Sequence, residues 1–225
     1  MTPVEKLGAA RRYPSALPVE DRILLVMLPG AGIAADDFAD HGFIAAVQGR
    51  VPTLDIVALR PDIELYLDGN IAPVLHEGII VPAVASGIRR IWLLGLSLGG
   101  MGALLYSSAY PDLVEGLVLL APFLGTHGTM AELTRAGRFV DWSAKGSAAT
   151  APERQLLTWI QGHLRAGRTT PKLFLGHATR DRFAAGHRLL AAALPASQVV
   201  EVDGVHNWAA WTQAWQDILA LNPFA

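Results

Sequence analysis

The chain has 225 residues, of which 52% are hydrophobic and 17% are charged, and its formal net charge at pH 7 is −2. This length suffices for one α/β domain with a sizeable core, and the near-neutral charge offers no electrostatic footprint for nucleic acid or an anionic membrane. The sequence contains no cysteine, which excludes disulfides, thiol catalysis and cysteine-ligated zinc.

Apolar runs alternate with amphipathic segments along most of the chain. Residues 1–20 are polar, can include a short edge strand and lack the apolar segment of a secretory leader, so we expect a cytoplasmic protein. Buried strands are predicted at 23–28, 54–60, from 91 up to the serine at 97, and at 114–123, 172–178 and 198–203. Helices are predicted at 36–48, at about 71–86, from the serine at 97 up to 110, and at 183–194 and 207–221. The helix at about 71–86 should be irregular because it contains Pro73, Gly78 and Pro82.

This alternation predicts an α/β fold: a mostly parallel sheet with helices on both faces, whose ligands bind beyond the carboxyl ends of the strands. Residues 124–169 interrupt the alternation with a partly helical, glycine-containing stretch that includes the run Ser147–Pro152. No internal repeat or linker divides the chain. We therefore predict a single domain over residues 1–225 with a small insert at 124–169.

The stretch IWLLGLSLGGMG at 91–102 has the spacing G-x-S-x-G around Ser97. This is the spacing of a nucleophile elbow, a sharp strand-to-helix turn that raises a serine hydroxyl above the edge of the sheet. Any larger side chain at Gly95 or Gly99 would strike the neighbouring strand or helix. A helix that begins at the serine also directs its free N–H groups and positive dipole end at the reacting oxygen.

The same stretch is open to two other interpretations. Residues 91–110 carry no charge and contain a G-x-x-x-G pair, as a membrane-spanning helix can. A buried strand followed by a buried helix gives the same hydropathy, and no second span accompanies it, so we expect no membrane partner. Alternatively, Ser97 is a plain turn residue.

Four predicted strand ends should meet in one crevice, and they carry Pro29–Gly32, Ser97, His177–Asp181 and Gly204–His206. A serine hydroxyl needs a base to remove its proton, and histidine suits that role near neutral pH. The imidazolium formed needs an anion that holds its orientation. Serine, then acid, then histidine is the chain order of hydrolases that use this elbow.

With these motifs the chain resembles a small member of the α/β-hydrolase superfamily from Ile23 onward. The resemblance rests on LPGAG at 28–32, GLSLGG at 95–100, GHATRDRF at 176–183 and GVHNWAAW at 204–211. The G-x-H-x-W ending is similar to that of esterase-D-like carboxylesterases. The resemblance implies an α/β-hydrolase fold with a short cap at the insert, and the roles of nucleophile for Ser97, orienting acid for Asp181 and general base for His206.

The same resemblance implies an oxyanion hole made of backbone N–H groups. One would belong to Leu98, and the other to the 30–32 turn, with Ala31 as the first choice. Many relatives carry His-Gly where this chain has Pro29-Gly30. This difference leaves open which N–H of the turn points inward.

Other carboxylates compete for the role of the acid. Asp203 lies close before the histidine at 206 and is expected to cap the turn, and Asp141 lies in the insert. Asp181 is flanked by Arg180 and Arg182, so an alternative is a solvated ion pair.

The remaining histidines and the tryptophans near the C-terminus have simpler explanations. His127 lies in the insert, where it could contact substrate, whereas no metal spacing such as H-E-x-x-H and no complete phosphate loop is present. Helical spacing suggests core packing for the tryptophans Trp208, Trp211 and Trp215. Helix surfaces are predicted for the histidines His41, His76, His163 and His187.

The expected function is that of a serine hydrolase that cleaves the carboxylic ester of a small or medium substrate through an acyl-enzyme, with no cofactor or metal. The insert is expected to shape the acyl pocket. A thioesterase or an acyltransferase would use the same residues. The remaining hypothesis is a non-catalytic protein of this fold that binds a ligand.

Overall fold

The computed structural model describes residues 2, 5–15, 22–143 and 151–225. In this part of the chain, seven strands form one sheet in the order β1-β3-β2-β4-β5-β6-β7. Neighbouring strands are parallel except β1 and β3, which are antiparallel. The strands are β1 (Arg11–Tyr13), β2 (Ile23–Leu28), β3 (Leu54–Ala58), β4 (Arg90–Leu96), β5 (Gly116–Leu120), β6 (Lys172–Ala178) and β7 (Val199–Val202).

The central strands are apolar because helices cover both of their faces. Every residue of β2 and β5 is buried, and β4 and β6 expose only part of their first residue. A strand buried on both faces is a continuous apolar run, which is why the predictions for 23–28 and 172–178 coincide with β2 and β6. The short edge strand expected in the first twenty residues is β1, while residues 16–21 lie outside the described part.

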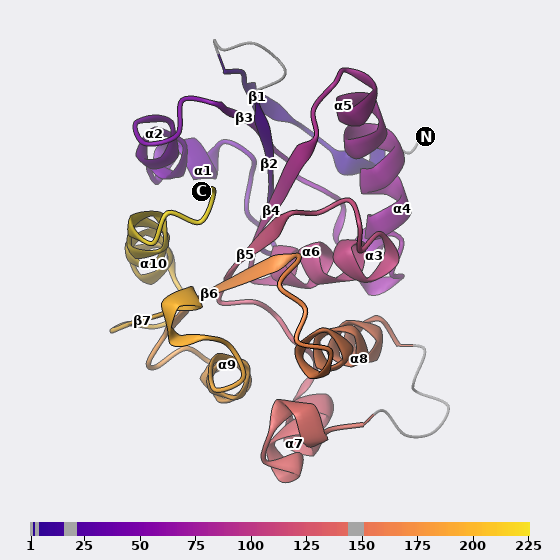
Figure 1. The fold of residues 1–225 in the computed structure, drawn as a ribbon, viewed down its shortest axis with the longest axis vertical. Helices are drawn as coiled ribbons and strands as arrows, with labels where there is room; N and C mark the ends of the chain where they lie inside the picture. The colour runs from indigo at the N-terminus through magenta and orange to yellow at the C-terminus, as the bar shows by residue number, and fades with distance from the viewer. Residues whose placement is uncertain (1, 3–4, 16–21, 144–150) are drawn as a thin grey trace.

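Helices pack on both faces of the sheet (Figure 1). On one face, α3, α4, α6 and α8 surround a core that includes Leu104 and Leu157; on the other, α1, α2 and α10 surround Trp215. The helices are α1 (Asp37–Asp40), α2 (Phe43–Gln48), α3 (Ile63–Leu67), α4 (Ile71–Leu75), α5 (Val81–Ala85), α6 (Leu98–Ala109), α7 (His127–Ala136), α8 (Pro152–Arg165), α9 (Ala184–Ala191) and α10 (Trp208–Ala220). Short helical turns are η1 (Glu5–Leu7), η3 (His76–Ile80), η4 (Phe139–Asp141) and η6 (Ala196–Gln198).

Two of the predicted helices differ from simple continuous ones. The helix predicted over 36–48 is two helices, α1 and α2, because Gly42 between them has a φ of +77° and ends the first one. The helix predicted over about 71–86 is irregular as expected, since the π-helical turn η3 separates α4 from α5. Pro82 has no N–H and its ring would clash with the carbonyl four residues earlier, and the wider π turn relieves that clash.

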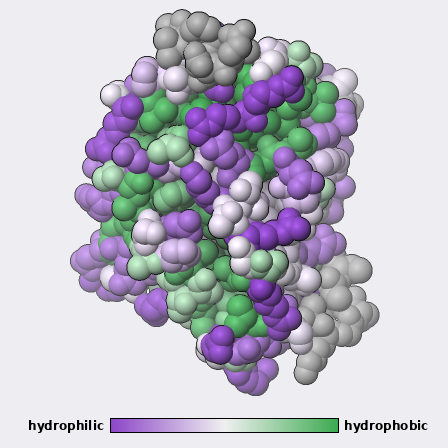
Figure 2. All heavy atoms as spheres, in the orientation of Figure 1, coloured by the Kyte–Doolittle hydropathy of each residue, from purple (hydrophilic) through white to green (hydrophobic). Residues whose placement is uncertain are grey.

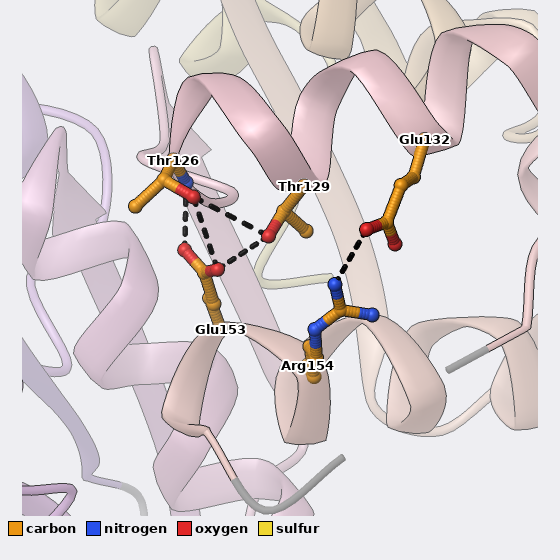
Figure 3. Close-up of polar contacts among 5 residues, drawn as sticks. All are labelled: Thr126, Thr129, Glu132, Glu153 and Arg154. Carbon is orange, nitrogen blue, oxygen red and sulfur yellow. Dashed lines mark hydrogen bonds and ion pairs between the residues drawn. The ribbon is translucent and has the colours of Figure 1, made fainter. Parts of the chain in front are cut away.

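The insert contains α7, η4 and α8, and its residues 144–150, which include most of the predicted run Ser147–Pro152, lie outside the described part. Helix α8 packs against α6 and covers the sheet, whereas α7 lies farther out, against α9 (Figure 1). The carboxylate of Glu153 accepts hydrogen bonds from the Thr126 N–H and from the hydroxyls of Thr126 and Thr129 (Figure 3). Arg154 pairs with Glu132 at 2.7 Å. These contacts attach the start of α7 to the start of α8.

The stretch at 91–110 forms most of the strand β4 and the helix α6. Among the described residues, no helix is long and apolar enough to cross a membrane. On the face of the molecule in Figure 2, hydrophilic and hydrophobic residues are interspersed.

Candidate active site

Ser97 occupies the turn between β4 and α6, with φ 52° and ψ −113°. A Cβ on Gly95 would lie 2.5 Å from the Cα of Gly100 in α6, and one on Gly99 would lie 1.9 Å from the carbonyl oxygen of Leu28 at the end of β2. These distances confirm that a larger side chain at either glycine would collide with a neighbouring element. The two glycines let the strand, the helix and β2 approach closely enough to form the turn.

The structure brings three predicted side chains together at the carboxyl ends of the strands. The Nε2 atom of His206 lies 2.9 Å from the Oγ of Ser97, and its Nδ1 atom lies 2.7 Å from Oδ2 of Asp181. The side chain of Asp181 is 0% exposed and that of His206 is 9% exposed. The imidazole therefore bridges hydroxyl and carboxylate in a site that is nearly closed to water.

The environment of Asp181 favours its ionised form. Burial alone would raise the pKa of this carboxyl, but hydrogen bonds from His206 and from the N–H of Phe183, at 2.8 Å, lower it below its ordinary value of 3.8. Arg180 instead pairs with Asp203 at 2.9 Å. Asp203 also accepts a hydrogen bond from the Thr179 hydroxyl, at 3.0 Å. The competing carboxylate thus has other partners.

The third candidate acid, Asp141, lies in the turn η4 and pairs with Arg138 at 3.6 Å. Its partner is therefore a neighbour within the insert. Of the three carboxylates weighed from the sequence, Asp181 is the one that hydrogen-bonds His206.

Two aromatic rings contact the imidazole. The ring of Phe183 meets that of His206 edge-on at 5.2 Å, and the ring of Trp211 does so at 4.9 Å. The side chain of Asn207, directly after this histidine, accepts a hydrogen bond from the N–H of Ala210 and caps α10. Trp211 was expected only in the core; it lies there, and it also contacts the imidazole.

Comparisons with known proteins identify the fold. A family model described as alpha/beta hydrolase fold matches residues 84–174. The S-formylglutathione hydrolase FrmB from Staphylococcus aureus aligns with a TM-score of 0.61 and 16% identity, over 91% of this chain and 83% of its own. A monoacylglycerol lipase from Paleococcus ferrophilus aligns with a TM-score of 0.59 and 14% identity, over 96% and 98% of the two chains. The chain has the α/β-hydrolase fold.

A further solved structure with this fold is the fluorophosphonate-binding serine hydrolase FphF from Staphylococcus aureus, with a TM-score of 0.59 and 14% identity over 93% of this chain and 87% of that one. No curated protein sequence matches the chain significantly.

The turn after β2 lies beside the serine of this α/β-hydrolase fold. The N–H of Ile33 bonds to the carbonyl of Gly30 at 3.2 Å, and Gly32 has a φ of +76°. A Cβ on Gly30 would lie 3.2 Å from the Cβ of Ser97, which shows how closely this turn approaches the elbow. At the other side, Leu98 is the first residue of α6, so its N–H has no partner inside the helix.

A cleft of about 360 Å³ opens next to this turn. Its walls come from the turn itself, from the first residue of α6 and from α3, where Ile63 is 50% exposed. The residues named for the oxyanion hole, Ala31 and Leu98, both line it. The cleft therefore borders the turn and the residue that follows the serine, whereas Ser97 itself is not part of its wall.

Two histidines expected on helix surfaces are buried, and that expectation was wrong for both. His187 in α9 is 0% exposed and His163 in α8 is 6% exposed. For His187 the sequence spacing indicates burial. This histidine follows Phe183 by four residues and precedes Leu190 by three, which places it on the apolar face of the helix. Burial lowers the pKa of His187 to about 4 and also lowers the pKa of His163.

Three further histidines, in or beside helices, lie outside the bonded group of three. His41 is exposed and stacks on Trp208, His76 is half-buried beside Tyr106, and His127 is exposed at the start of α7. Within the described ranges, no three histidine, aspartate or glutamate side chains are grouped so that they could hold a metal ion.

Proposed function

We propose that this chain is a serine hydrolase that cleaves the carboxylic ester of a small or medium substrate through an acyl-enzyme. The observation that supports this most directly is the position of His206, 2.9 Å from the serine hydroxyl and 2.7 Å from the carboxylate. In such an arrangement one ring nitrogen accepts the serine proton while the other donates to the acid. The ionised form of Asp181 then stabilises the imidazolium.

In the first half of the reaction, the Oγ of Ser97 attacks the ester carbonyl carbon and its proton moves to Nε2 of His206. The carbonyl oxygen becomes an oxyanion, which the N–H groups of Leu98 and Ala31 stabilise at the start of α6 and in the turn after β2. The intermediate collapses when His206 returns the proton to the leaving alcohol. In the second half, His206 removes a proton from water as its oxygen attacks the acyl carbon. The imidazolium then gives this proton to the Oγ of Ser97 as the bond between that oxygen and the acyl carbon breaks, which releases the acid and restores the serine hydroxyl and the neutral imidazole.

The cleft beside the turn suits the substrate group next to the scissile carbonyl. Its volume of about 360 Å³ favours a small or medium group, and its wall combines the exposed apolar side chain of Ile63 with the charged residues Arg60 and Asp62. Solved neighbours named ferulic acid esterase and monoacylglycerol lipase support an ester as the substrate class. We further propose that the chain is a single domain over 1–225 and that its cap lies in the insert at 124–169.

Labelling with a fluorophosphonate probe tests the role of the serine. The probe should label the wild-type protein, and substitution of Ser97 by Ala should abolish labelling and lower ester turnover by about 10⁴-fold. The variant His206→Ala should behave in the same way. Ser107→Ala, a buried serine ten residues farther along and near the end of α6, is the matched control and should retain both signals.

The alternatives separate in the same experiment. A protein that binds a ligand without turnover predicts an unlabelled serine in the wild type. If the serine is labelled, competition between water, alcohols and thiols for the acyl-enzyme distinguishes an esterase from an acyltransferase, and matched esters and thioesters distinguish it from a thioesterase. Retention of a tenth of the turnover in Ser97→Ala would remove this serine from the mechanism.

A further inference from the structure

His187 is a fully buried histidine that takes no part in the proton transfers proposed above. Its Nε2 atom lies 2.9 Å from the carbonyl oxygen of Pro122, just beyond the end of β5. Its Nδ1 atom is buried and has no hydrogen-bond partner among the described residues. A carbonyl can only accept, so this contact requires a proton on Nε2.

The carbonyl that accepts this bond belongs to a loop that holds the serine. The N–H of Phe123 donates to the carbonyl oxygen of Ser97 at 2.8 Å. Pro122 lies against α6, since a Cβ on Gly100 would be 2.6 Å from the Cβ of this proline. Ala121 has a φ of +45°, a conformation that L-residues rarely adopt and that persists only when the surroundings hold it.

The other side of His187 leads to the acid. Its own N–H donates to the carbonyl of Phe183 at 3.3 Å, and the N–H of Phe183 donates to Oδ1 of Asp181 at 2.8 Å. The ring of Phe183 meets those of Phe123 at 5.5 Å and His206 at 5.2 Å, both edge-on. The loop after β5 and the loop after β6 therefore meet around this histidine.

We propose that His187 is a positioning residue that joins the loop holding Ser97 to the loop holding Asp181. The bond from Nε2 to Pro122 closes a ring of contacts that runs from the serine through His206, the acid and α9 back to the serine. The ring keeps the serine hydroxyl and the carboxylate at the spacing that the imidazole must bridge. This role rests on the proposed function of the site.

The variants His187→Leu and His187→Gln separate the effect of the hydrogen bond that His187 donates from the effect of the space that its side chain fills. Leucine fills the space without a donor, whereas the side-chain amide of glutamine can donate to the same carbonyl. In His187→Leu, kcat for the ester and the rate of fluorophosphonate labelling should fall by about tenfold or more, with KM nearly unchanged, because small displacements of reacting groups are costly. His187→Gln should recover most of both rates.

Two results would overturn the positioning role while leaving the proposed function intact. In the first, the wild-type serine is labelled and the labelling rate of His187→Leu lies within about twofold of the wild-type rate. In the second, His187→Leu and His187→Gln both fold and lose equal amounts of activity. A serine that is unreactive in the wild type would overturn the proposed function together with this role. Long-range ¹H–¹⁵N spectra of the wild-type protein give a test that needs no variant to fold. They should show the Nε2–H tautomer for His187, and the Nδ1–H tautomer would overturn the proposal.

Discussion

Ser97 is held in its strained conformation by backbone hydrogen bonds from three directions. Its N–H donates to the carbonyl of Leu120 at 2.9 Å, and its own carbonyl accepts from Gly100 at 3.0 Å and from Phe123 at 2.8 Å. A positive φ at a non-glycine residue is costly, so it persists where neighbours compensate for it. The position of the hydroxyl thus depends on the end of β5 and the start of α6 as much as on the serine.

Gly99→Ala should destabilise the protein and disable the site. The added Cβ would lie 1.9 Å from the carbonyl oxygen of Leu28, so β2 or α6 must move. We expect a loss of about 3 kcal/mol in the free energy of unfolding, the upper end of the usual overpacking penalty, and loss of fluorophosphonate labelling. Denaturant unfolding and probe labelling measure the two effects.

Gly162→Ala is the matched control, because a Cβ at this exposed position of α8 meets nothing within 4 Å. Alanine in a helix interior is better than glycine, so this variant should be more stable by about 0.5–1 kcal/mol and should be labelled normally. Equal losses of stability in Gly99→Ala and Gly162→Ala would show that the close approach of β2 to Gly99 is not the cause of the destabilisation.

How much of the site could be predicted differs from residue to residue. Ser97, Asp181 and His206 could be picked out because each lies within four residues of the end of a strand and their chain order is distinctive. The role of Phe183 could not, because an aromatic residue at the start of a helix has many explanations. The burial of His187 differs from the predicted helix surface because this side chain lies on the apolar face of α9.

At the level of whole elements, the attachment of α7 depends on a carboxylate from another helix. Thr126, just before α7, makes no side-chain hydrogen bond that caps the helix, whereas Glu153 in α8 accepts from its N–H and its hydroxyl (Figure 3). Sequence could predict a partly helical insert at 124–169, but not this pairing. The pairing depends on tertiary contacts between residues 24 and 27 positions apart, which helical periodicity does not report.

Glu153→Ala should loosen α7 while leaving the sheet intact. Hydrogen bonds to a charged group contribute about 1.5–3 kcal/mol, so amides of 127–136 should exchange with deuterium at least tenfold faster, whereas those of β2 and β5 should be unchanged. The control is Glu64→Ala, an exposed glutamate of α3. Unaltered exchange in α7 would mean that its apolar contacts suffice to hold it. If α7 is part of the cap, the ratio of the KM of Glu153→Ala to that of the wild type should also depend on the length of the substrate's acyl chain.

For the whole molecule, the overall architecture was the most predictable property. Continuous apolar runs predicted the buried strands, and their alternation with helices predicted a parallel sheet, whose carboxyl ends then brought distant loops together. The protonation state of the interior was not predictable in the same way. It depends on which polar side chains the packed helices enclose, and three histidines, His163, His177 and His187, are among them.

Enclosure of neutral histidines makes the stability of the folded chain depend on pH. Burial lowers the pKa of His163, His177 and His187, the last from 6.5 to about 4. Below pH 6.5 the unfolded chain takes up protons that the folded chain does not, so the free energy of unfolding falls as the pH falls towards 4. His187 alone accounts for a loss of about 3 kcal/mol over that range.

The pKa of Asp181 lies below 3.8, so its stabilising contribution persists through that range and is lost only at lower pH. Urea unfolding across the acid range measures the slope, and His187→Gln should reduce it because glutamine does not titrate. Unfolding free energies that stay constant between pH 6.5 and 4 would contradict the burial of these side chains as neutral groups.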